Sequence, residues 1–236
     1  MIEMFGDPLF WLFVLPGLLL GVYAQSRIKL NIARYSRVPT TQGLTGGEVA
    51  RRILNARGLG DVAVESTPGM LSDHYDPRTK TLRLSQNVYF APTVAAAGIA
   101  AHEAGHAIQD AEDYFPLEAR SYIVPLVQLS SQIAPWLFIA GLTFENVILT
   151  WIGVFLFGAS SLFSLITLPV EFNASARALE QLSRHGIIDG EEQIQGVKKV
   201  LSAAAWTYVA AAMSAIGSWL FYIVLMLSNT RGSSAR

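Results

Sequence analysis

Cysteine is absent from the 236 residues of this sequence. Its absence excludes disulfide bonds and thiolate zinc sites, so any bound metal must take its ligands from His, Asp or Glu. Charge is also scarce, since Asp, Glu, Lys and Arg make up 15% of the chain and the net charge is −1. A balance this close to zero favours neither nucleic acid nor an acidic substrate, and we expect no nucleic-acid partner.

Positive charge is missing ahead of the first apolar run. Residues 1–7 contain Glu3 and Asp7 but no Lys or Arg, whereas a secretory signal peptide begins with a basic region. The triplet at 22–24 resembles a cleavage site, yet the basic start is lacking. We therefore interpret residues 1–24 as an uncleaved N-terminal membrane anchor.

Apolar residues are abundant, at 52% of the chain, and they are concentrated in long runs. Four stretches approach the roughly 20 residues that a helix needs to cross a bilayer. These stretches are 8–24, 123–142, 147–168 and 200–227. They predict an integral membrane protein, in contact with the lipid bilayer, with about four transmembrane helices. Such spans are able to bury against a membrane-protein partner or regulator as readily as against lipid.

Lys and Arg are distributed unevenly around these stretches. The segments 25–120 and 169–199 hold all of the 17 Lys and Arg residues except Arg231 and Arg236. The positive-inside rule then makes both segments cytosolic, which predicts a multi-pass protein of the cell (inner) membrane. The predicted order is an anchor (1–24), a cytosolic segment (25–120), a transmembrane hairpin (121–168), cytosolic helices (169–199), a C-terminal transmembrane helix (200–228) and a tail (229–236).

Local patterns predict a small α+β domain in the first cytosolic segment. The tetrapeptide 45–48, Thr-Gly-Gly-Glu, is a capping box, and it opens a helix that we expect to end near Gly58. Strand-like runs follow at 61–66, 71–75 and 81–85, which we interpret as a short β-meander. The predicted fold class is therefore a mainly α integral membrane protein with a small cytosolic α+β domain.

The motif that carries chemistry lies in the Ala-rich stretch 94–109, which favours helix. His102 and His106 are four residues apart, so one helical face presents both imidazoles to one ion. Glu103 can approach a water on that ion without binding the metal. Zinc lowers the pKa of its water, the Glu takes the proton, and the hydroxide attacks a peptide carbonyl. This HExxH motif predicts one catalytic zinc ion per chain and no other cofactor.

A third protein ligand is expected, because catalytic zinc usually has three and keeps one open position. The metzincin pattern would require Gly and His where the sequence has Gln109 and Glu112. His74 and His185 are suitable by type but have no supporting spacing. Glu171 follows the third apolar stretch, and the hairpin before it returns the chain to the membrane face that bears the motif helix. We therefore favour Glu171, with Glu112 and His74 as the alternatives.

These motifs resemble those of the YugP-like family of bacterial membrane zinc metallopeptidases and, more distantly, HtpX-type and CAAX-prenyl-protease-type gluzincins. The resemblance rests on the run 71–77, the sequence HEAGH at 102–106, and the run 168–172. It implies a zincin-like cytosolic domain in which Glu171 begins the ExxxD motif and is the third zinc ligand. The Asp of that motif is replaced here by Ser175, whose hydroxyl is still able to accept an imidazole N–H.

In zincin-type peptidases an edge strand above the motif helix pairs with an extended substrate. The run 81–85, or its partner 71–75, is the expected edge strand here. His74 on that hairpin is a further catalytic candidate, since it is able to reach the oxyanion that forms during hydrolysis.

The sequence thus predicts a membrane-embedded zinc-dependent endopeptidase. Its expected substrates are membrane or membrane-proximal proteins or peptides at the cytosolic face. The alternative is a non-enzymatic, zinc-braced membrane scaffold or adaptor. The intact Glu103 argues against that alternative, because a purely structural zinc site has no need of this residue. Specificity for a lipidated C-terminus would rest on fold analogy alone.

Overall fold

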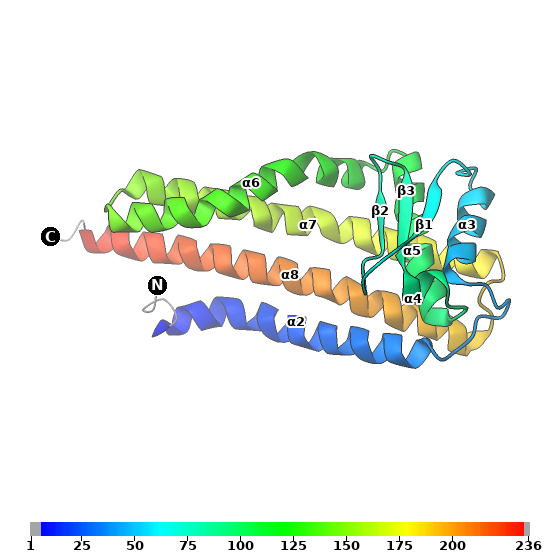
Figure 1. The fold of residues 1–236 in the computed structure, drawn as a ribbon. Coiled ribbons are helices and arrows are strands. Elements are labelled where there is room, and N and C mark those ends of the chain that lie inside the picture. The colour runs from blue at the N-terminus through cyan, green and yellow to red at the C-terminus, as the bar shows by residue number, and fades with distance from the viewer. Residues whose placement is uncertain (1–5, 234–236) are drawn as a thin grey trace. The chain divides into compact units, whose positions relative to one another are not determined.

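The computed structural model describes residues 6–233, with side chains up to residue 228 (Figure 1). Residues 1–5 of the predicted anchor, residues 234–236 of the predicted tail, and the side chain of Arg231 lie outside the described part. The elements in chain order are α2 (Pro8–Tyr35), α3 (Gly46–Ala56), β1 (Ala63–Thr67), β2 (His74–Asp76), β3 (Thr81–Ser85), α4 (Gln86–Tyr89), α5 (Val94–Ala111), α6 (Phe115–Thr143), α7 (Val147–Arg184) and α8 (Gly190–Ser233).

Four of these helices are long and apolar enough to cross a membrane, namely α2, α6, α7 and α8. Together with the single small sheet of the described residues, they confirm the predicted mainly helical fold with four membrane-spanning candidates. Each helix extends beyond the apolar stretch that predicted it, and the first reaches 28 residues. The chain divides into two compact units, which are described separately below.

The first unit, here called the apolar unit, consists in its described part of residues 6–23, 119–168 and 206–233. Within it, α2 and α8 approach so closely that a Cβ atom at Gly17 would lie 2.4 Å from the Ser214 hydroxyl oxygen. The indole of Trp219 donates a hydrogen bond of 3.0 Å to the carbonyl of Val154 on α7. Small residues and a partly buried polar link of this kind hold membrane helices together, because lipid and side chains are equally apolar.

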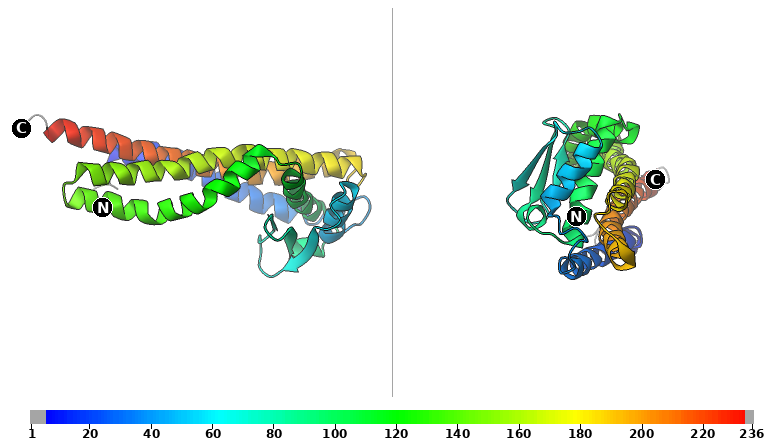
Figure 2. Two further views of the ribbon diagram at one scale, coloured as in Figure 1. Left: turned by 90° about the horizontal axis from the view of Figure 1, so that it is seen from above. Right: turned by 90° about the vertical axis from the view of Figure 1, so that its right-hand side faces the viewer.

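The second unit, here called the site unit, consists of residues 24–118 and 169–205. Its core surrounds α5, whose alanines are buried against Ile53 and Leu54 of α3 and Leu182 of α7. The sheet lies beside α5 (Figure 1, Figure 2). Short alanine side chains let the neighbouring elements approach this helix closely, which positions its polar residues at a buried location.

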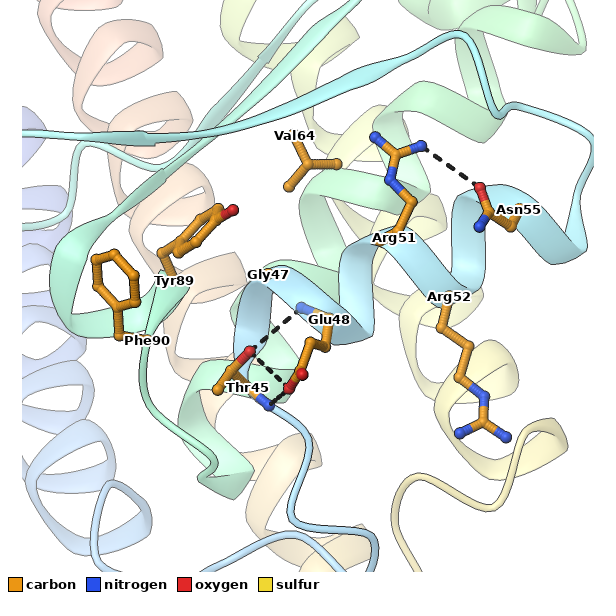
Figure 3. A pocket seen from close by; sticks show the side chains of 9 residues that line it. All are labelled: Thr45, Gly47, Glu48, Arg51, Arg52, Asn55, Val64, Tyr89 and Phe90. Atoms are coloured by element: carbon orange, nitrogen blue, oxygen red, sulfur yellow. Dashed lines mark hydrogen bonds between the residues drawn. The ribbon is translucent and has the colours of Figure 1, made fainter.

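The predicted capping box of α3 is confirmed (Figure 3). The Thr45 hydroxyl accepts a hydrogen bond of 3.3 Å from the Glu48 backbone N–H, and the Glu48 carboxylate accepts one of 2.8 Å from the Thr45 backbone N–H. Both donors belong to the first turn, where the helix itself offers no acceptor. The helix ends at Ala56, and Gly58 follows with a positive φ of 74°, close to the predicted end.

The strand order is β1-β3-β2, so the predicted β-meander is wrong. β3 pairs with β1 in parallel and with β2 in antiparallel orientation. Leu82 and Leu84 make β3 the most apolar of the three strands, and both are fully buried, which places β3 in the centre. The suggestion that 81–85 is the edge strand is wrong for the same reason. The more polar β2, with its His-Tyr-Asp sequence, lies at one edge.

Candidate metal centre

Helix α5 supplies three of the predicted site residues. It begins after Thr93, whose hydroxyl accepts a hydrogen bond of 3.3 Å from the Ala96 backbone N–H. One turn separates His102 from His106, and their ring centroids lie 4.7 Å apart. Glu103 has only 9% of its surface exposed. The predicted HExxH helix therefore carries its two imidazoles side by side, as the spacing requires.

The predicted third ligand comes from α7. One carboxylate oxygen of Glu171, Oε2, lies 3.1 Å from Nε2 of His102 and 3.6 Å from Nε2 of His106. Glu171 is buried, with 2% of its surface exposed. The approach of the two helices depends on Gly105, because a Cβ atom there would lie 2.8 Å from the carbonyl oxygen of Ala174. The conformation of this helix pair thus brings a residue 65 positions after His106 into contact with it.

These three side chains fit a metal ion by donor chemistry as well as by distance. One ligand atom of each lies within 4.8 Å of the others. The Nδ1 atoms of both imidazoles are already occupied, His102 by the Ser175 hydroxyl at 3.2 Å and His106 by Gln109 Oε1 at 2.9 Å. Both Nε2 atoms are therefore the ones directed at Glu171. Two imidazoles and one carboxylate form the donor set of catalytic zinc sites that keep an open position.

The electrostatic environment of these residues favours a cation. Burial by itself lowers the pKa of His106, but its hydrogen bond to Glu171 and the negative charges of Glu103 and Glu171 raise that pKa above its usual value. Two carboxylates thus act on the same imidazole in a largely buried place. A divalent ion there would be compensated by both charges and would replace the proton that the imidazole otherwise attracts.

The other candidate ligands do not join this group among the described residues. Glu112 ends α5 and forms ion pairs with Arg57 and, at 2.6 Å, with Arg177. His74 lies exposed on β2, where its Nδ1 is 2.8 Å from the Ser72 carbonyl oxygen. His185 follows the end of α7. Of the residues considered for the third position, the structure brings only Glu171 to the two imidazoles.

Gln109 is a residue of this centre that the sequence analysis missed. In the sequence it stands out only as the position where a metzincin has glycine. Its side chain is completely buried and contacts His106, Val170 and Asn173. A signal was present in the sequence, because Gln109 lies three residues after His106 and therefore on the same helical face.

A separate hollow of about 730 Å³ lies elsewhere in the site unit (Figure 3). It is lined by Thr45, Gly47, Glu48, Arg51, Arg52, Asn55, Val64, Tyr89 and Phe90. None of the predicted ligands is among these residues. The metal-ligand group and this hollow are therefore two different features.

The site geometry defines a class of protein, namely one in which two histidines of one helix and a glutamate of a later helix form a group that could hold a metal ion. The sequence matches a family model described as "Putative neutral zinc metallopeptidase" over residues 10–228. The chain belongs to this family. It is 44% identical over 221 residues to the "Putative membrane protease YugP" of Bacillus subtilis (strain 168), an alignment that covers 94% of this chain and 98% of the relative.

The predicted resemblance to the YugP-like family is thereby confirmed. The family description indicates zinc and peptidase chemistry, and the name of the relative indicates a membrane protein, in agreement with the four apolar helices. No solved structure matches the chain at a significant level.

Proposed function

We propose that this protein is a membrane-embedded zinc-dependent endopeptidase that cuts membrane or membrane-proximal proteins at the cytosolic face. The observation that carries the proposal is the convergence of His102, His106 and Glu171, with both Nε2 atoms within 3.6 Å of the same carboxylate oxygen. The family description and the name of the Bacillus relative support the same activity.

His102, His106 and Glu171 would hold the zinc, which supplies a Lewis acid that lowers the pKa of water and polarises a peptide carbonyl. Glu103 is the proposed general base and accepts a proton from the attacking water. Its carboxylate makes no hydrogen bond with another described residue and is partly accessible, so it is available for that proton. Ser175 orients the His102 ring through Nδ1.

His74 remains a candidate for substrate contact. It lies on the edge strand β2, and its side chain is exposed. In this strand His74 and Asp76 are aligned with Arg83 and Thr81 of β3, while Tyr75 between them directs its backbone groups to the open side. An extended peptide could add to this edge by backbone pairing, with His74 next to the chain it holds.

The cytosolic orientation is supported by the charge distribution of the sequence. The site unit contains nearly all of the Lys and Arg residues, whereas the turn between α6 and α7 contains none. By the positive-inside rule, this distribution supports a location of His102, His106 and Glu171 on the cytosolic side of the cell membrane.

The test compares the full chain with three variants in detergent micelles, measuring bound zinc and cleavage of labelled casein. Glu103→Gln is expected to retain one zinc per chain while cleavage falls by roughly 10²- to 10⁴-fold, because only the proton acceptor is lost. Glu171→Ala is expected to lose zinc to a chelator that leaves the wild type loaded. Glu180→Gln, which removes an exposed carboxylate on the same helix as Glu171, is expected to change neither quantity.

Undiminished cleavage by Glu103→Gln would remove this residue from the mechanism. Retained zinc in Glu171→Ala would redirect the search for the third ligand to Glu112 or His74. A wild-type protein that holds zinc but cleaves no protein offered to it would favour the scaffold alternative.

A further inference from the structure

Gln109 lies between the metal-ligand group and a chain of polar side chains that runs away from it. It follows His106 by three residues on α5, and no part of its side chain is exposed. Its Oε1 atom is 2.9 Å from His106 Nδ1. Burying a whole amide costs free energy unless every polar atom finds a partner, so the partners of this amide determine which way it points.

The NH₂ group of the Gln109 amide donates to two acceptor oxygens. Nε2 of Gln109 donates to the Val170 carbonyl oxygen and to Asn173 Oδ1, both at 2.9 Å. If the amide were reversed, its oxygen would face the oxygens of Val170 and Asn173, and its NH₂ group would face the imidazole. Two buried hydrogen bonds would then be lost. The Gln109 amide therefore presents an oxygen to His106, and that oxygen only accepts.

The orientation of Asn173 is determined in turn by Arg177. The Arg177 Nε atom donates to the same Oδ1 atom at 2.6 Å, and its Nη1 atom donates to Glu112 Oε2 at 2.6 Å. A guanidinium has donors only and cannot be reversed. Asn173 must therefore present its oxygen, Gln109 must present its NH₂ group to Asn173, and His106 must carry a hydrogen on Nδ1.

We propose that Gln109 is a positioning residue that holds His106 in the tautomer with Nδ1 protonated and Nε2 free for a metal. The Val170 carbonyl, together with Asn173 and Arg177, imposes the direction of this hydrogen-bond chain. The inference rests on the proposed function, because a free Nε2 matters only if His106 binds a metal. All of these residues belong to the site unit.

The two imidazoles differ in this respect. His102 Nδ1 faces the hydroxyl of Ser175, and a hydroxyl both donates and accepts. Ser175 therefore holds the His102 ring in place without selecting its tautomer. Gln109 holds the His106 ring in place and also selects its tautomer. The inference predicts a difference between two histidines of the same site, which a general stabilising effect would not produce.

The first experiment measures zinc affinity of the full chain in detergent by competition with a chromogenic chelator. Gln109→Ala is expected to bind zinc about 10- to 100-fold more weakly, the usual effect of losing a partner of a ligating histidine. The matched control is Gln181→Ala, which removes another buried glutamine of the site unit, 3% exposed, that makes no hydrogen bond to His106 among the described residues. Its zinc affinity is expected to equal that of the wild type.

A conservative pair of variants tests the direction of the chain without touching Gln109. Asn173→Asp retains an oxygen that accepts from both Gln109 and Arg177, and its zinc affinity is expected to stay close to the wild-type value. Asn173→Leu removes that acceptor, leaves the Gln109 amide held in its orientation by the Val170 carbonyl alone, and is expected to weaken zinc binding about tenfold.

The second readout is the ¹⁵N NMR spectrum of the histidines in metal-free Glu171→Ala at alkaline pH, because this variant lacks the carboxylate that competes for a hydrogen on Nε2 of His106. Glu171→Ala is expected to show His106 as the Nδ1-protonated tautomer, and the double variant that also carries Gln109→Ala is expected to show a mixture of tautomers. This measurement requires no bound metal. It reports on Gln109 even if the wild type binds no zinc, an outcome that would overturn the proposed function alone.

Two results would overturn the inference itself. One is equal zinc affinity of Gln109→Ala, Gln181→Ala and the wild type, or an equal loss in both variants. The other is an unchanged His106 tautomer when Gln109→Ala is added to Glu171→Ala. If Gln109→Ala does not fold, as judged by circular dichroism, the Asn173 pair decides, and equal affinities of Asn173→Asp and Asn173→Leu would contradict the proposal.

Discussion

Asp110 connects α5, the helix that carries His102 and His106, to the edge strand β2. Its Oδ2 atom accepts hydrogen bonds of 2.6 Å from the Tyr75 hydroxyl and from Lys80 Nζ. Asp110 lies one helical turn after His106, and Tyr75 lies on β2. Burial, together with the hydrogen bond to Asp110 and the nearby carboxylate charges, raises the pKa of Tyr75 far above its usual value.

The raised pKa of Tyr75 predicts that the fold loses stability at alkaline pH. A phenol whose pKa is higher in the folded than in the unfolded state contributes fully below the unfolded pKa of about 10, and the contribution is lost as the pH rises above that value. Tyr75→Phe is expected to lower the free energy of unfolding by about 1 kcal/mol near neutral pH through the lost hydrogen bond. Its difference from the wild type should shrink as the pH is raised beyond 10.

The measurement is the thermal midpoint of both proteins between neutral pH and about pH 11, the range that surrounds the ordinary tyrosine pKa. Tyr89→Phe is the control, since the Tyr89 hydroxyl makes no hydrogen bond with another described residue. It is expected to match the wild type throughout. If the thermal midpoints of Tyr75→Phe and the wild type differed by the same amount at every pH, the raised pKa of Tyr75 would be contradicted.

The crossing of α5 and α7 is the contact between elements on which the metal-ligand group depends. Gly105 lies between the two histidines in sequence, and its missing side chain lets the backbone of Ala174 approach. Residues 171 and 175, which face the imidazoles, lie on either side of Ala174 in α7. Any displacement of one helix against the other would therefore move Glu171 and Ser175 together.

Gly105→Ala is expected to destabilise the fold by about 1 to 3 kcal/mol, because the added methyl group meets backbone that must shift. It is also expected to weaken zinc binding. Gly98→Ala is the matched control on the same helix, where the new Cβ atom would lie 3.5 Å from a Val197 methyl group, an ordinary contact. That variant should keep or gain stability, since alanine favours helix over glycine by about 1 kcal/mol.

Chemical denaturation and chelator competition measure the two quantities on the same preparations. If Gly105→Ala retained both wild-type stability and wild-type zinc affinity, the close approach of α5 and α7 would not be what positions Glu171.

For the whole molecule, the orientation in the membrane decides which proteins the site unit can meet. The absence of cysteine makes this orientation easy to test, because each introduced thiol is unique in the chain. Ser66→Cys places a thiol on the exposed face of β1, and Phe144→Cys places one in the exposed turn between α6 and α7. A membrane-impermeant maleimide reports which of these positions is accessible from outside intact cells.

We expect Phe144→Cys to be labelled in intact cells and Ser66→Cys only after permeabilisation, because the positive-inside rule keeps the Arg- and Lys-rich segments in the cytosol. The unmodified chain is the control and should remain unlabelled in both conditions. Labelling of Ser66→Cys from outside would reverse the topology and assign the proposed activity to the opposite face.

Much of this fold follows from short-range patterns. The apolar runs predict four spanning helices, the tetrapeptide at 45–48 predicts a capped helix, and the spacing of His102 and His106 places both imidazoles on one face. Each of these features depends on residues within one continuous stretch of the chain. Backbone geometry leaves such neighbours few alternatives, and the structure agrees in all three cases.

Features between distant segments required the folded chain. The order β1-β3-β2 depends on how deeply Leu82 and Leu84 are buried, which the alternation of polar and apolar residues does not express. The topology of the apolar hairpin suggested that Glu171 returns to the histidines, but the distances of 3.1 and 3.6 Å depend on the contact at Gly105. Its role as a ligand stays a prediction.

The link from Asn173 and Arg177 on α7 to Gln109 on α5 could not be predicted from the sequence. Glutamine, asparagine and arginine are ordinary surface residues, and nothing in their spacing shows that α5 and α7 bury them against each other. The bond that joins the two helices links Gln109 and Asn173, which are 64 residues apart, so its direction is defined only once α5 and α7 are packed together. Residue types determined which chemistry was available, and close helix packing determined which nitrogen of His106 faces Glu171.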